Sequence, residues 1–92
     1  SVLYIDSYGN VISNISRKMF DDIGAGRRFS ISFRKPGFDI SDLSESYSDV
    51  IVAERLALFG SNGLLEIAIS YGDASKLMGM EVNDMVSIIF ES

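Results

Sequence analysis

The sequence predicts an all-β domain, a small barrel or sandwich of about six or seven short strands with one or two short helical turns. Three observations indicate this fold class. Strand-forming residues occur in short runs, and turn-forming residues separate these runs roughly every ten positions. One run also alternates between apolar and polar residues with a period of two.

The first predicted element is a β-hairpin, which is followed by a short helix. Residues 2–5 are apolar and rich in strand formers, residues 7–10 form a turn, and residues 11–15 return as the second strand. The helix covers residues 16–23, capped by the serine at its start and ended by Gly24.

The clearest strand pattern covers residues 28–34. Phe29, Ile31 and Phe33 share one face, and the two serines between them share the other. This alternation is typical of a half-buried strand. The Pro-Gly pair that follows ends the strand, because Pro cannot donate to a ladder and Gly permits a turn.

The second half of the chain begins with a polar loop over residues 38–49, rich in Ser and Asp. Further strands are predicted at residues 50–52, 56–59, 64–70 and 86–91. The third of these places its odd-numbered residues on one apolar face. A helical turn over residues 72–78 precedes the last strand, with Asp73 as N-cap and Gly79 as its end.

Composition restricts the chemistry. The chain has 92 residues, one domain's length, and contains neither Cys nor His. Thiolate chemistry is excluded, and the commonest general base and metal ligand is missing. We therefore expect no self-sufficient hydrolase site, and we assign no catalytic or metal-binding residue within the chain.

Charge and hydropathy restrict the partners. The net charge of −5 argues against nucleic acid, and the apolar runs are far shorter than the ~20 residues of a membrane helix. No signal peptide is visible, so a cytoplasmic location is expected. The chain begins directly with a strand, which is more typical of a domain boundary than of a free N-terminus, and a preceding partner domain is an open alternative on the sequence.

Two segments, residues 6–14 and 60–69, join a strand to a Gly-containing polar turn. Asp6 ends a strand, where its carboxylate can face a pocket mouth. The Asn10 amide can both donate and accept, as an adenine edge requires. On these residues alone, a simple turn cap remains the favoured interpretation. Glu66, charged within an apolar strand, must face solvent, a subunit or a ligand.

Three tyrosines could supply a stacking surface for a purine: Tyr8, Tyr47 and Tyr71. More often, such residues pack their rings and keep the hydroxyl in water. Both interpretations stay open on the sequence. The polar groups of Ser61 and Asn62 likewise suit either a ligand or an ordinary turn.

Three motifs together resemble one family, and they cover nearly all of the chain. They are Ile5-Asp-Ser-Tyr-Gly-Asn-Val-Ile-Ser-Asn-Ile15, Leu56-Ala-Leu-Phe-Gly-Ser-Asn-Gly-Leu-Leu-Glu-Ile-Ala68 and Gly72-Asp-Ala-Ser-Lys-Leu-Met-Gly79. In order and spacing they are similar to the C-terminal domain of the S-adenosyl-L-methionine hydrolases, the S-adenosyl-L-methionine hydroxide adenosyltransferases. These enzymes are relatives of the fluorinating and chlorinating enzymes.

The resemblance implies a small, closed or partly closed Greek-key β-barrel as the C-terminal domain of a two-domain enzyme. A larger N-terminal α/β domain would carry the activating Asp, Arg and His. The enzymes would be homotrimers, with S-adenosyl-L-methionine bound between the N-terminal domain of one subunit and the C-terminal domain of its neighbour. Water would attack the 5′ carbon and release methionine and adenosine, with no cofactor beyond the substrate.

The resemblance also implies ligand contacts at the nucleoside end. Asn10 would hold the adenine edge, with Tyr8 lining the same pocket. Tyr47 would pack on the adenine, Glu66 would face the nucleoside, and the backbone of Ile69 would complete adenine recognition.

At the methionine end, the resemblance places Asp6 near the ammonium group, where an acceptor carboxylate is electrostatically favourable. Ser61 and Asn62 would bind the amino-acid end, although Asn62 stands where Ser or Arg is usual. At the adenine end, Ser70 and Tyr71 stand where Asn is usual, which bears on the exact adenine contacts. Two alternatives stay open on the sequence: a halogenase domain, and a stand-alone binding or assembly module.

Overall fold

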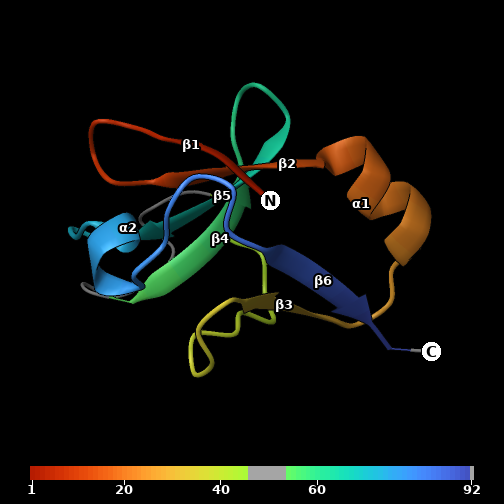
Figure 1. Ribbon diagram of the computed structural model, residues 1–92. Helices are drawn as coiled ribbons and strands as arrows, with labels where there is room; N and C mark the ends of the chain where they lie inside the picture. The colour runs from red at the N-terminus through yellow and green to blue at the C-terminus, as the bar shows by residue number, and fades with distance from the viewer. Residues whose placement is uncertain (46–53, 92) are drawn as a thin grey trace.

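A computed structural model describes residues 1–45 and 54–91 of the chain. Its strands are β1 (Val2–Ile5), β2 (Val11–Ser16), β3 (Phe29–Phe33), β4 (Arg55–Phe59), β5 (Leu64–Ile69) and β6 (Val86–Phe90). Its helices are α1 (Arg17–Gly24) and α2 (Ala74–Leu77) (Figure 1). The predicted edge strand at residues 50–52 and Tyr47 lie outside the described residues.

The strands form two small antiparallel sheets. One has four strands in the order β1-β2-β5-β4, and the other pairs β3 with β6. Figure 1 shows the β3–β6 pair running beside the larger sheet, with α1 leading from β2 towards it. The all-β prediction is confirmed. No closed barrel is found among residues 1–45 and 54–91, and the Greek-key barrel stays a prediction.

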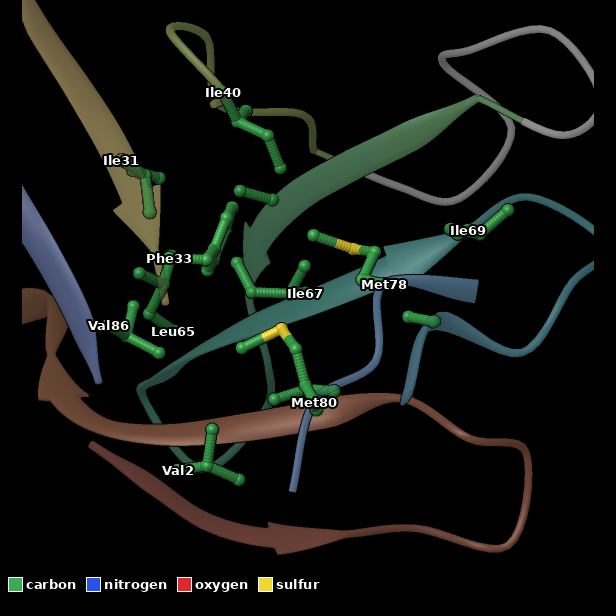
Figure 2. Packing of buried hydrophobic residues seen from close by; sticks show 13 residues of the cluster. Val2, Ile31, Phe33, Ile40, Leu65, Ile67, Ile69, Met78, Met80 and Val86 are labelled. Atoms are coloured by element: carbon green, nitrogen blue, oxygen red, sulfur yellow. The ribbon is translucent and has the colours of Figure 1, made fainter. Parts of the chain in front are cut away.

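The core lies between the two sheets. Leu65 and Ile67 of β5 point towards Phe33 of β3 and Val86 of β6 (Figure 2). Leu65 and Ile67 have no exposed surface. The predicted alternation in β3 and β5 is therefore confirmed, because the residues of the apolar faces meet across the sheets.

Helix α1 begins as the sequence predicts but ends differently. The Ser16 hydroxyl accepts a hydrogen bond from the Met19 N–H at 3.1 Å, so Ser16 is the N-cap. Gly24, predicted to end the helix, is its last residue instead, and Ala25 takes the left-handed conformation with a φ of 48°. Gly24 lies against the Phe90 ring, where a Cβ would come within 2.6 Å of Cε1. The glycine is needed for this close approach, and the prediction of its role was wrong.

Exchanging the residue types at these two positions should therefore have opposite effects. Gly24→Ala should lower the free energy of unfolding by about 1–3 kcal/mol, because its Cβ overlaps with Phe90. Ala25→Gly should raise it by about 0.5–1 kcal/mol, because glycine relieves the left-handed strain. Urea unfolding of the two variants checks this, and two changes of the same sign would contradict it.

Within the part of the chain that the structure describes, no helix has the length and apolar character needed to cross a membrane. The longest, α1, has eight residues.

Candidate functional site

A cavity of about 650 Å³ opens beside the β1–β2 turn and the end of β5. Its lining residues are Asp6, Tyr8, Asn10, Ile69, Ser70, Tyr71 and Gly72. The volume falls within the range of small-molecule sites. Four of the predicted site residues meet here: Asp6, Tyr8, Asn10 and Ile69.

Strand register explains why Asn10 faces this cavity. Val11 pairs with Ile67 of β5, and both are core residues. Successive side chains on a strand alternate between faces, so Asn10 projects from the face of the sheet opposite the core. There it is 9% exposed, a buried amide at the wall of an open cavity.

The Asp6 carboxylate organises the turn. Its Oδ1 accepts hydrogen bonds from the backbone N–H groups of Tyr8 at 2.9 Å and Asn10 at 3.0 Å. Its Oδ2 accepts one from Asn10 Nδ2 at 3.1 Å. Three of roughly four lone-pair sites on the carboxylate are therefore used. The predicted contact of Asp6 with an ammonium group stays a prediction, with one acceptor site left for it.

The tip of the same turn is packed against the N-terminus of α2. Gly9 has a φ of 82°, and a Cβ there would overlap with the carboxyl carbon of Asp73. The Gly9 carbonyl accepts a hydrogen bond from the Ser75 N–H at 2.9 Å. Asp73 in turn accepts hydrogen bonds from the Ser75 hydroxyl and the Lys76 N–H, as the predicted N-cap. These contacts hold the cavity wall in place.

The hydrogen bond from the Ser75 hydroxyl, then that from the Lys76 N–H, lowers the pKa of Asp73 below its ordinary value of 3.8. Because its pKa is lower in the folded state, ionised Asp73 stabilises the fold at pH values above the pKa of the unfolded state. This stabilisation is lost as the pH falls through the pKa of the folded state. Asp73→Asn keeps a capping side chain but cannot titrate. We therefore expect a flatter loss of stability below pH ~4 in the variant than in the parent, measured by urea unfolding across acidic pH. Parallel curves for the two proteins would contradict this expectation.

Two tyrosines flank the cavity mouth. The side chains of Tyr8 and Tyr71 are 79% and 92% exposed. Tyr71 has a φ of 57°, a left-handed conformation that is costly for a bulky residue and often found at ligand sites. Such rings can stack on a flat ligand.

The site predicted from the sequence does not include Ser70, Tyr71 or Gly72. Tyr71 is weighed there as a stacking residue, and Ser70 and Tyr71 are noted only as standing where Asn is usual near the adenine contacts. The signal for Gly72 in the sequence is a glycine three residues after the end of the apolar strand β5. Its N–H donates to the Ile69 carbonyl at 2.9 Å, and a Cβ would lie 2.8 Å from Ile69 Cγ2. This tight turn carries all three residues into the cavity wall.

The remaining predicted residues form a second group, at the opposite end of β5. Ser61 and Asn62 occupy the β4–β5 turn, where Asn62 Oδ1 accepts a hydrogen bond from the Leu64 N–H at 3.1 Å. The Glu66 carboxylate reaches this turn, since a Cβ on Gly60 would lie 3.3 Å from both Glu66 Oε1 and Asn62 Oδ1. The structure thus brings Glu66 to the turn that carries Ser61 and Asn62, away from Asn10.

Both groups belong to the same face of the four-stranded sheet. Glu66 pairs with Ile12 of β2, and Ile12 and Asn10 are two residues apart. Residues two apart on a strand share a face, so Glu66 and Asn10 project from the same side. At about 3.3 Å per residue, the groups are separated along β5 by roughly 7–17 Å. Between the two groups on this face lie Ile12, Leu58 and Ala68, whose side chains are buried.

Comparisons with known proteins agree with this architecture. The sequence model of the SAM hydroxide adenosyltransferase C-terminal domain matches residues 1–87. The fold is similar to that of an uncharacterized conserved protein from Thermotoga maritima, with a TM-score of 0.78, 29% identity and 95% of this chain covered. It is also similar to that of a conserved hypothetical protein from Thermus thermophilus, with a TM-score of 0.75, 25% identity and 96% covered.

In both comparisons the chain spans 33% of the length of the matched protein. The family is shown by the sequence model, which matches residues 1–87, most of the chain. The chain belongs to the SAM hydroxide adenosyltransferase C-terminal domain family.

Proposed function

We propose that this domain binds the adenosyl group of S-adenosyl-L-methionine within a larger enzyme that hydrolyses this substrate to adenosine and L-methionine. One observation carries the proposal: the cavity beside the β1–β2 turn holds a buried amide, Asn10, fixed by Asp6 between two exposed tyrosines. Membership of an adenosyltransferase family supplies the substrate class.

Adenine recognition follows from the cavity wall. Adenine offers an amino donor next to a ring nitrogen acceptor, and the Asn10 amide can pair with both. Ile69 lines the same cavity, and we propose that its backbone completes the polar contacts. Tyr8 and Tyr71 flank the base, and stacking on an aromatic ring contributes about 1–3 kcal/mol per base.

We propose that the second group extends the site along the sheet. From Asn10, the shared face of the sheet leads past Glu66 to Ser61 and Asn62. This order matches the substrate, in which adenine, ribose and methionine follow one another. We propose that Glu66 faces the ribose and that the turn binds the amino-acid end. We propose that Tyr47 packs on the adenine.

The domain contributes positioning rather than chemistry. Its sequence contains no His or Cys, the usual bases and nucleophiles of such reactions. We propose that an N-terminal domain activates the water for attack at C5′ and that the site is completed by a neighbouring subunit of a cytoplasmic homotrimer. Holding water and the sulfonium-bearing carbon in line is the main source of rate enhancement. The proposal requires no cofactor.

Isotope labelling of the protein at its natural length tests the reaction. Incubation with S-adenosyl-L-methionine in 18O-labelled water should place the label in the 5′-hydroxyl of adenosine and leave methionine unlabelled, as read by mass spectrometry. Parallel reactions with chloride or fluoride should give no 5′-halogenated product. A halogenated nucleoside would identify a halogenase instead, and label in neither product would rule out water attack at C5′.

The division of labour is tested separately. The 92-residue chain alone should release no methionine from S-adenosyl-L-methionine. Turnover by this chain would refute the assignment of the chemistry to another domain.

A further inference from the structure

We infer that Asp6 makes the cavity selective for 6-aminopurines by fixing which way the Asn10 amide faces. This inference rests on the proposed function, since it concerns the base that the same cavity binds. Asp6 is then a positioning residue: it acts on the ligand through Asn10.

The hydrogen bonds around Asp6 determine the orientation of the amide. A carboxylate only accepts hydrogen bonds, so the atom of Asn10 that lies 3.1 Å from Asp6 Oδ2 must be the nitrogen. The carboxylate cannot rotate freely, because Oδ1 is held by the backbone N–H groups of Tyr8 and Asn10. If the amide were rotated by half a turn, Asn10 Oδ1 would face Asp6 Oδ2, and both of these oxygens are acceptors.

The rest of the amide is available to a ligand. Within the described residues, the Asn10 side chain makes no hydrogen bond other than the one to Asp6. Its Oδ1 and the second hydrogen on Nδ2 are therefore available to a ligand. Asp6 determines which of the two positions holds the acceptor and which holds the donor. Gly9 packs against Asp73 and Ser75, which keeps the cavity wall in place. The wall therefore cannot shift to suit a ligand whose donor and acceptor groups are exchanged.

This fixed order discriminates between purines. Adenine presents an amino donor that the Asn10 oxygen can accept, next to a ring acceptor for the nitrogen. Hypoxanthine presents a carbonyl oxygen in place of the amino group, so two acceptors would face each other. Asn10 is 9% exposed, and a buried polar group left unpaired costs far more than one in water. Adenosine should therefore bind better than inosine.

The substitution D6N tests this directly. The introduced amide can keep its oxygen on the two backbone N–H groups, but its nitrogen then replaces Oδ2 and faces Asn10 Nδ2. Two donors repel, so the Asn10 amide should turn over and present its donor group where the amino group of adenine binds. The ratio of inosine to adenosine dissociation constants should fall roughly tenfold or more.

Calorimetric titration of the protein at its natural length with adenosine and inosine measures this ratio. Thermal unfolding controls for folding, and D6S is the second variant. Its hydroxyl can still accept from the backbone but is too short to hold Asn10, so the ratio should fall there as well. Loss of both affinities in equal proportion would indicate a merely structural role and overturn the inference.

The outcomes separate the inference from the proposed function. If the parent protein binds adenosine and both folded variants keep its preference over inosine, only the inference fails. If the parent binds neither nucleoside, the proposed function fails and the inference falls with it.

Discussion

Replacing Asn10 with alanine should weaken adenosine binding roughly 10- to 100-fold, the effect expected for the loss of one bidentate contact to a base. Asn10 supplies the buried amide of the cavity wall. In the described part of the chain, its side chain forms a hydrogen bond only with Asp6. Its removal would take away both of the hydrogen bonds to adenine that we propose for it. It also leaves the Asp6 carboxylate facing the base, where its charge would repel the ring nitrogens.

Calorimetric titration with adenosine measures this change, and Asn62→Ala is a matched control. Asn62 is also an asparagine in a β-turn, but it lies at the other end of β5 and accepts its hydrogen bond from Leu64. Adenosine lacks the methionine end, so Asn62→Ala should leave its affinity unchanged. Equal affinities for the parent and Asn10→Ala would exclude the assigned role of Asn10.

The local elements of this fold could be predicted because their causes are local. The alternation of Phe29, Ile31 and Phe33 predicts β3, and the Ser16 hydroxyl predicts the start of α1. Gly24 shows where such reasoning fails. Its role depends on Phe90, which is far away in the sequence, and a close approach of this kind leaves no signal near the glycine itself.

The candidate site shows the same division. The turn carrying Asp6 and Asn10 could be predicted, because a short polar turn after a strand positions its own side chains. Which predicted residues meet depends on the pairing of β2 with β5, and this register separates Asn10 from Ser61. Ser70 joins the cavity through the turn that follows β5. Neither result follows from residue types alone.

The register of β2 and β5 also places the core residues and the proposed ligand-binding residues on opposite faces of the sheet. Val11 and Ile67 bury their side chains in the core, while Asn10 and Glu66 project from the opposite face of the same strands. A substitution of Asn10 or Glu66 can therefore change a proposed ligand contact without removing a side chain from the main core. The Gly9 turn is the exception, because there the cavity wall and the packing of α2 depend on one residue.

Replacing Gly9 with alanine should therefore affect stability and binding together. The free energy of unfolding should fall by about 2–5 kcal/mol. About 1–2 kcal/mol comes from a left-handed alanine and about 1–3 kcal/mol from overlap with Asp73. Asp73 cannot move aside freely, because its carboxylate is held by Ser75 and Lys76. Any shift that admits the methyl group must also move the turn that carries Asn10.

Gly26→Ala separates the two causes. Gly26 has a φ of 78°, close to the 82° of Gly9, but a Cβ there would meet nothing within 4 Å. This control should lose only about 1–2 kcal/mol, the cost of the left-handed conformation, and should keep its affinity for adenosine. Urea unfolding and calorimetric titration of both variants measure the difference. If the two variants lose the same stability, the contact between Gly9 and Asp73 does not hold the cavity wall. If Gly9→Ala loses more stability and adenosine affinity falls with it, the packing of α2 supports the Asn10 turn.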